Sequence, residues 1–170
     1  MPVTCKEITS LLSASFTPLL KPHGFLKTRL TWQREMDRIT QVFNIQKSAW
    51  DQNPYHCSYY INLRVQLREQ AEPPGSGEVS ARLGSIASEY DDSLLRFENC
   101  DALECADRIR RVCAIVSEKG LPWLSQLSNF NEIRSAYEAG MFRSLFAGVG
   151  MLRAIGVTRV TDRTGQTRKI

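Results

Sequence analysis

The sequence predicts an α+β protein: an antiparallel β-sheet of three to five strands, arranged as a meander, packed on one face by helices. The first observation is the run from Tyr59 to Leu67, where apolar or aromatic residues alternate with polar ones. Such alternation is typical of a half-buried strand, because successive side chains point to opposite faces. The second is an apolar stripe at three- and four-residue steps within residues 4–21, which predicts an amphipathic helix. The third is the shortness of the connections between candidate strands, which favours antiparallel pairing with one face in water.

The N-terminal helix has a clear start and a clear end in the sequence. Thr4 and Glu7 have the spacing of a capping box, in which each side chain satisfies a free backbone amide at the helix start. Pro22 and Gly24 end the helix, because proline cannot continue the hydrogen-bond ladder and glycine tolerates the left-handed cap. Pro18 lies inside the stretch, and we expect it to kink the helix or to move its end earlier.

Three segments after this helix predict the main strands of the sheet. The first is 25–36, in which Leu26, Leu30 and Trp32 share one parity. A tight turn at 35–38 leads into the second strand, 39–47, and a loop at 48–56 leads into the third, 57–68. Weaker strand patterns lie at 79–88 and 93–98, beyond a Pro- and Gly-rich loop.

The second half of the chain is predicted to be mainly helical. Asp101 and Glu104 form an acidic N-terminal cap for a mid-chain helix that runs to Gly120. Further helical segments are expected from Leu121, over 131–139 and over 142–155. We expect one α+β domain over 1–157, and a basic C-terminal tail or small hairpin over 158–170, of which we favour the tail.

The composition limits the classes of protein to consider. The chain is 42% hydrophobic and 24% charged, with a net charge of +4, which is ordinary for a globular domain and low for a dedicated nucleic-acid binder. Its five cysteines are an odd number without a Cys-x-x-Cys pair, and no secretory signal or membrane-spanning run is evident. These features favour free thiols in a reducing cytoplasm.

Several short motifs, in order and closely spaced, carry a resemblance to a known family. They are Gly24-Phe25-x-Lys27, Trp32-x-Arg34, Val42-x-Asn44-x-Gln46-Lys47-Ser48, Tyr60-Ile61-Asn62-Leu63, Arg82-Leu83-Gly84 and Gly120-Leu121-Pro122-Trp123-Leu124. Over about residues 5–135 the chain resembles the bacterial family known as domain of unknown function 4304. The resemblance implies an α+β domain from a bacterial cytoplasm, and it brings no established activity, cofactor or catalytic residue.

The polar side chains that alternate with apolar ones along the predicted strands form the candidate binding surface. If the apolar parities face the helices, the other parities gather amides and cations on one side, namely Lys27, Arg29, Gln33, Asn44, Gln46, Asn62, Arg64 and Arg68. Arginine can bind a carboxylate or phosphate with two hydrogen bonds, so this face suits an anionic partner. The alternative is a solvated sheet face. The binding residues that we predict are Lys27, Arg29, Asn44, Gln46, Lys47, Trp50, Asn62 and Arg64.

Catalytic and metal sites are not indicated by the sequence. His56 and Cys57 are neighbours in a predicted strand, so they point to opposite faces and cannot readily act as base and nucleophile. Cys100, Cys105 and Cys113 lack the paired spacing of a structural zinc site. Gly148-Val149-Gly150 lacks the third glycine of a dinucleotide loop, and small residues for close packing are the simpler explanation. We predict no catalytic residue, no metal and no cofactor.

Three functions remain open. The first is a non-enzymatic protein-interaction module, of which immunity or antitoxin-type neutralisation is one form, acting through the polar sheet face. The second is an enzyme or binder that acts on a small anionic substrate. The third is a nucleic-acid accessory protein, which the modest net charge disfavours. A homodimer formed through the sheet face or an open strand edge is a further option, and no membrane partner is expected.

Overall fold

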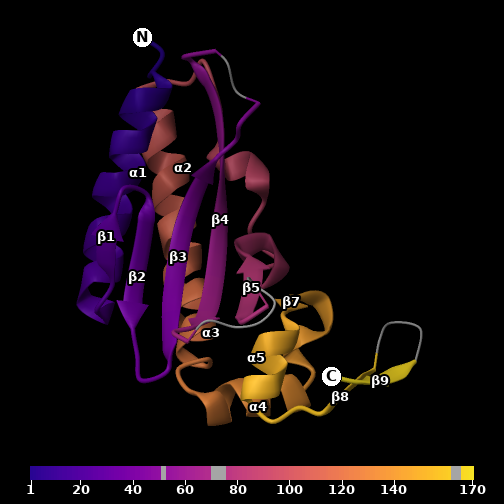
Figure 1. Cartoon of the computed structure of the whole chain (residues 1–170). Helices are drawn as coiled ribbons and strands as arrows, with labels where there is room; N and C mark the ends of the chain where they lie inside the picture. The colour runs from indigo at the N-terminus through magenta and orange to yellow at the C-terminus, as the bar shows by residue number, and fades with distance from the viewer. Residues whose placement is uncertain (51–52, 70–75, 162–165) are drawn as a thin grey trace.

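A twisted antiparallel sheet with two long helices against one face forms the body of the molecule (Figure 1). The computed structural model describes residues 1–50, 53–69, 76–161 and 166–170. Helices α1 (Cys5–Leu20) and α2 (Ala102–Ile115) lie side by side behind the sheet, whose other face is turned toward the viewer in Figure 1. The predicted α+β class, with helices on one face of an antiparallel sheet, is confirmed.

The strands of this sheet follow the order β1-β2-β3-β4-β5-β7, and β6 pairs with the beginning of β4. Their bounds are β1 Leu26–Thr28, β2 Thr31–Glu35, β3 Ile39–Lys47, β4 His56–Leu67, β5 Glu78–Arg82, β6 Arg96–Glu98 and β7 Phe146–Ala147. Both weaker strand patterns therefore contribute a strand. The first of them ends at Arg82, where a 3-10 turn over Leu83–Ser85 follows.

The start of α1 is capped as predicted. The Glu7 N–H donates to Thr4 Oγ1 at 3.3 Å, and the Thr4 N–H donates to Glu7 Oε2 at 2.7 Å. The expected earlier end at Pro18 is wrong, because the helix continues to Leu20. Pro18 lies in the last turn, where its missing N–H removes a single ladder bond and no further turn has to be built on it.

The segment 25–36 differs from the single strand that was predicted. It forms two strands, β1 and β2, joined by a tight turn in which Arg29 adopts a left-handed φ of 58°. Leu26 pairs with Gln33, so it lies on the face opposite to Trp32 and is 76% exposed. The expectation that Leu26 and Trp32 lie on one face is therefore wrong. The turn shifts the alternation, so that even-numbered residues of β1 lie on the same face as odd-numbered residues of β2.

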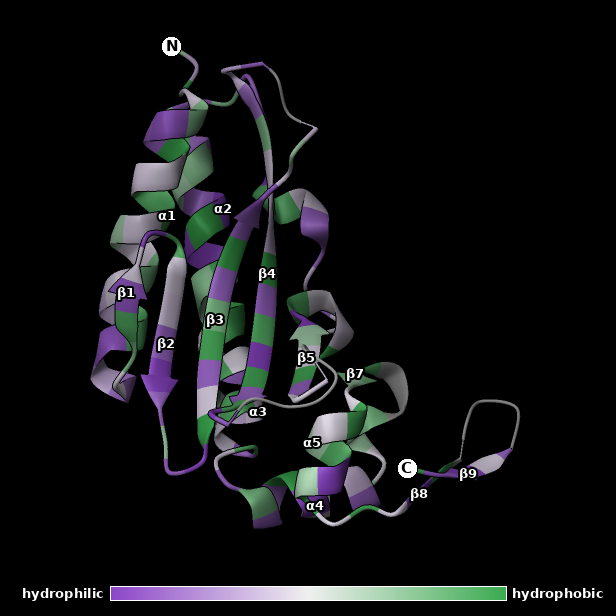
Figure 2. Cartoon of the chain, in the orientation of Figure 1, coloured by the Kyte–Doolittle hydropathy of each residue, from purple (hydrophilic) through white to green (hydrophobic). Residues whose placement is uncertain are grey.

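The core lies between α1, α2 and the inner face of the sheet. Figure 2 shows the alternation of hydrophilic and hydrophobic residues along β3 and β4 as bands of purple and green. On the inner face, Trp32 and Phe43 pack edge-on with ring centroids 5.8 Å apart, and Phe16 of α1 lies 5.4 Å from Phe43. All three rings are fully buried, so this cluster joins the first helix to the middle of the sheet.

The second half of the chain is less regular than predicted. After α2, a wider turn over Val116–Gly120 leads directly into α3 (Leu121–Ser125), and α4 (Phe130–Glu138) follows. The predicted helix over 142–155 is wrong in its first half, because β7 pairs with β5 before α5 (Val149–Ala154) begins. The last described residues form an antiparallel pair of β8 (Arg159–Thr161) and β9 (Thr167–Lys169). Among the helices of the described ranges, none combines the length and apolar character that crossing a membrane would require.

Candidate functional site

The register of the strands defines which side chains share the open face of the sheet. Residues directly opposite one another in antiparallel strands point to the same side. One row on the open face contains Thr31, Asn44, Asn62 and Arg82, and the next contains Leu26, Gln33, Val42, Arg64, Ser80 and Phe146. The open face is therefore mainly polar, with Val42 buried within it.

A pocket of about 440 Å³ lies on this open face, in the part formed by β3, β4 and β5. It is lined by Asn44, Gln46, Asn62, Arg64, Ser80, Ala81, Arg82, Ser85, Leu145 and Phe146. The sheet strands supply amide, guanidinium and hydroxyl groups, whereas the segment around β7 supplies two apolar side chains. The pocket thus has a polar floor and an apolar wall.

The three amide side chains of the floor hold one another in place. Asn62 Nδ2 donates to Asn44 Oδ1 at 3.3 Å and to Gln46 Oε1 at 3.1 Å. Asn44 Nδ2 in turn donates to Thr31 Oγ1 at 2.9 Å. This chain of hydrogen bonds fixes the amide orientations across β2, β3 and β4 without a ligand, so the floor is preorganised.

The two arginines of the pocket occupy diagonal positions on neighbouring strands. Arg64 pairs with Ser80, and Asn62 pairs with Arg82, which places the two cations one step apart across the ladder. The Arg82 guanidinium lies 4.6 Å from the centre of the Tyr60 ring, a cation–π contact that orients it. Arg64 Nε is buried, and within the described residues it has no hydrogen-bond partner.

The charge of the pocket is not balanced by its own lining. Among the described residues, no carboxylate lines it. Glu78 lies one step further along the same face, where it accepts a hydrogen bond from Gln66 Nε2 at 3.4 Å. The recess contains two guanidinium groups, and one of them, that of Arg64, has a buried donor without a partner among the described residues. Because no carboxylate of the described lining compensates this charge, the recess is suited to a ligand that carries negative charge.

Four of the eight predicted binding residues come together here, namely Asn44, Gln46, Asn62 and Arg64. The shared face expected for Lys27 is wrong, because the register pairs Lys27 with Trp32 on the inner-facing parity. Lys47 has the same inner-facing parity, opposite Tyr59. Because of the turn between β1 and β2, Lys27 and Leu26 each lie on the face opposite to the one that was predicted.

The remaining predicted residues lie outside the pocket. Arg29 occupies the turn between β1 and β2. Trp50 lies in the β3–β4 connection and is 91% exposed. Arg68, expected on the polar face, forms an ion pair with Glu35 at 3.0 Å and donates to carbonyls of the β2–β3 turn. These positions do not add to the recess.

Sequence reasoning missed six of the ten residues that line the pocket, including Arg82, Ser80 and Phe146. Arg82 stood in one of the family-like motifs, and Ser80 and Arg82 share a parity in the weaker strand pattern at 79–88. That signal could have placed them on one face, but not beside Arg64, because the register across the preceding loop is not a local property of the chain. Nothing in the pattern of residues 142–155 indicated that Phe146 reaches the sheet.

His56 and Cys57 point apart. His56 Nε2 lies 2.7 Å from Glu98 Oε1 on β6, and this hydrogen bond lowers the pKa of the Glu98 carboxyl group. Cys57 is fully buried, and burial raises the pKa of its thiol to about 12. The histidine is thus engaged elsewhere, and the thiol lacks the activation that a nucleophile needs.

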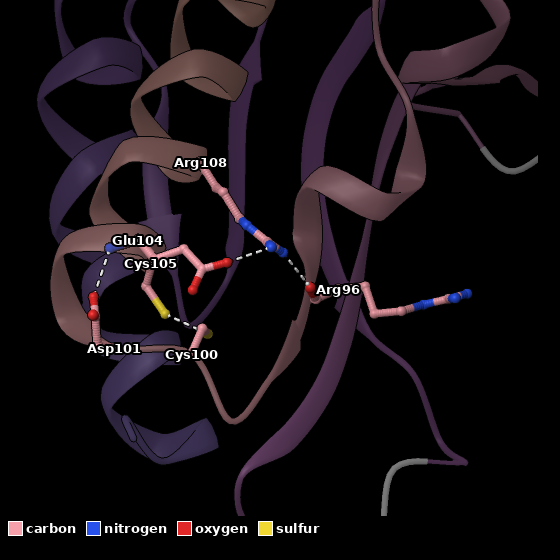
Figure 3. A network of polar contacts seen from close by, with 6 residues as sticks. All are labelled: Arg96, Cys100, Asp101, Glu104, Cys105 and Arg108. Carbon is pink, nitrogen blue, oxygen red and sulfur yellow. Dashed lines mark hydrogen bonds and ion pairs between the residues drawn. The ribbon is translucent and has the colours of Figure 1, made fainter. Parts of the chain in front are cut away.

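Two cysteines lie close together where the β6–α2 connection enters the helix (Figure 3). Cys100 and Cys105 approach to 2.8 Å between sulfur atoms, and burial raises the pKa of Cys105 to about 12. Arg108 joins the nearby elements by donating to Glu104 Oε1 at 2.5 Å and to the Arg96 carbonyl at 2.8 Å. Across the described part of the chain, no group of three or more metal-ligating side chains is found.

These buried thiols should be unreactive in the folded protein. Burial also raises the pKa of Cys113 to about 11, so at pH 8 only about one thiol in a thousand or fewer is a thiolate at Cys57, Cys105 and Cys113. We expect Ellman's reagent to react slowly with the native protein and to titrate all five cysteines in concentrated urea. Rapid reaction of Cys57 or Cys105 in the native state would contradict this assignment.

The fold and the pocket together define an α+β domain with a preorganised polar recess on the open face of its sheet. Residues 16–126 match the family described as Domain of unknown function (DUF4304), and the chain belongs to this family. No curated protein and no solved structure matches the chain. The matched region includes the polar floor of the pocket, whereas Leu145 and Phe146 lie beyond it.

Proposed function

We infer that this protein is a non-enzymatic binding module that recognises an anionic group in the pocket on the open face of its sheet. The observation that carries the inference is Arg64, whose buried Nε has no hydrogen-bond partner among the described residues while its side chain lines the pocket. A buried donor without a partner costs free energy, and an acceptor from a ligand that reorients the guanidinium offsets that cost.

The lining supports binding rather than catalysis. Recognition of an anion needs fixed positive charge and hydrogen-bond donors, which the two guanidinium groups and the Ser80 and Ser85 hydroxyls provide. Catalysis would need a base, an acid or an activated nucleophile in reach of the same ligand. Within the described residues, the lining includes no carboxylate, histidine or cysteine that could take such a role.

The anionic group has two candidate sources. A partner protein would present it as an acidic side chain, and this form includes neutralisation of the immunity or antitoxin kind. A small anionic ligand is the second candidate, because a recess of about 440 Å³ falls in the range of small-molecule sites. Both sources use the same contacts with Arg64 and Arg82.

The contribution of Arg64 can be measured directly. In ¹⁵N-labelled protein the arginine Nε–H signals are visible, and Arg64→Gln identifies the signal of interest. Titration with sodium phosphate or sodium acetate, with ionic strength held constant by chloride, should move this signal in a saturable manner. Arg64→Gln should weaken the binding seen at the Asn44 and Asn62 amides about 10- to 100-fold, as expected for a charge-assisted hydrogen bond.

Arg111→Gln is the matched control, because it removes the same charge from an exposed position on the α2 segment, behind the sheet. It should bind both anions as the native protein does. The native protein, Arg64→Gln and Arg111→Gln are then each used to capture partners from a bacterial lysate. If the anionic group belongs to a partner protein, that partner should be captured by the native protein and by Arg111→Gln but not by Arg64→Gln. The proposed function would be refuted if Arg64→Gln left anion binding unaffected. It would also be refuted if all three proteins captured nucleic acid equally and with a steep dependence on salt.

A further inference from the structure

The apolar wall of the pocket comes from a part of the chain that the family match does not include. Phe146 in β7 lies directly opposite Ser80 in β5, which puts its side chain on the open face beside the cationic floor. Its side chain is 55% exposed, and Leu145 lines the same recess. The match ends at residue 126, so the polar floor and the apolar wall have different origins within the chain.

Backbone hydrogen bonds hold this wall against the sheet. The Gly148 N–H donates to the Glu78 carbonyl at 2.8 Å, and the Met151 N–H donates to the Ser76 carbonyl at 3.1 Å. Phe146 is therefore kept at the rim by contacts that do not involve its own ring. Since the ring is exposed and lines the pocket, it can cover a ligand that enters there.

We propose that the ligand carries an apolar group, preferably a flat one, directly beside its anionic group, and that Phe146 selects for this group. The proposal rests on the function inferred above and names the chemical class of the ligand: an organic anion with an apolar body. The anionic end contacts Arg64 and Arg82, and the apolar end packs on Phe146 and Leu145. An offset or edge-to-face contact with an aromatic ring adds to the gain from burial.

Two sources offer this chemistry. One is a small aryl or alkyl anion, and the other is an acidic side chain next to an aromatic one on a partner protein. Matched probes separate them from each other and from a simple ion. The small probes are phenyl phosphate against methyl phosphate and benzoate against acetate. The peptide probes are acetyl-Glu-Phe-amide against acetyl-Glu-Ala-amide.

The test compares affinities for each pair of probes by following the side-chain signals of Asn62 and Arg64. In the native protein, the aromatic member of at least one pair should bind about tenfold more tightly than its small counterpart. Phe146→Ala should remove this preference, so that the two members of the pair bind with similar affinity. Leu26→Ala is the control, because Leu26 is an exposed apolar residue on the same face but at the β1 edge.

The outcomes separate the two proposals. If the small anions bind through Arg64 but no aromatic probe is preferred, or if Phe146→Ala keeps the preference, the role of Phe146 is refuted and the proposed function stands. If no probe binds at all, the proposed function and the role of Phe146 are both refuted. A preference seen only with the peptide pair assigns the ligand to a partner protein, and one seen only with the small pairs assigns it to a free organic anion.

Discussion

Gly148→Ala should lower the free energy of unfolding by about 3 kcal/mol, because the added methyl group has no room. A Cβ at this position would lie 2.0 Å from the Ser76 carbonyl oxygen and 2.6 Å from its carbon. The backbone φ of −73° and ψ of 148° suit alanine, so the cost is steric rather than conformational. The clash is with backbone, which cannot rotate away as a side chain can, and relief requires that β7 move from β5.

Urea unfolding followed by circular dichroism measures this loss. Gly84→Ala is the matched control, because its Cβ would meet Tyr90 Cδ1 at an ordinary 3.5 Å, and it should change stability by less than about 0.5 kcal/mol. Since Gly148 also holds the apolar wall, the variant should lose the preference for aromatic anions while the polar floor still binds the small ones. Native stability with unchanged β7 amide signals would show that the close approach to Ser76 is wrong.

Gln41→Leu should lower the free energy of unfolding by a similar amount, about 3 kcal/mol, although leucine has nearly the same volume. Gln41 is fully buried on the inner face of β3. Its Nε2 donates to the carbonyls of Leu124 and Leu127 at 2.6 and 3.0 Å, and its Oε1 accepts from Arg34 Nε at 2.9 Å. Leucine would remove this donor from both carbonyls, of which that of Leu124 keeps the hydrogen bond from the Leu127 N–H, and it would leave Nε of the half-buried Arg34 guanidinium without its acceptor.

Burial already lowers the pKa of the Arg34 guanidinium, so the loss of the Gln41 oxygen removes a group that compensates a desolvated charge. Gln33→Leu makes the same chemical change on the exposed face of β2 and should alter stability by less than about 0.5 kcal/mol. Amide exchange should report where the effect falls, with faster exchange in α3 for Gln41→Leu only. Equal stability of the two variants would refute the bridging role of Gln41.

Much of the secondary structure was predictable because it depends on residues close together in the chain. The capping box at Thr4 and Glu7, the ends of β3 and the alternation through β4 all follow from local patterns and are present in the fold. The errors lie in two short segments. Residues 25–36 form two strands because Arg29 adopts a left-handed φ in a tight turn, which a non-glycine residue seldom does and which the alternation pattern does not indicate. The strand β7 interrupts an expected helix, because pairing with the distant β5 outweighs local propensity.

The sequence by itself determined that the chain is an α+β domain of this family with amides and cations on one parity of its central strands, and it identified Asn44, Asn62 and Arg64. Only the tertiary structure decided that Arg82 lies diagonally to Arg64, that Phe146 lines the same pocket, and that the turn after β1 puts Lys27 on the inner-facing side. Parity along one strand is a local property with a period of two residues. Register between strands depends on the intervening turns and loops, and a shift of one residue moves every side chain to the other face.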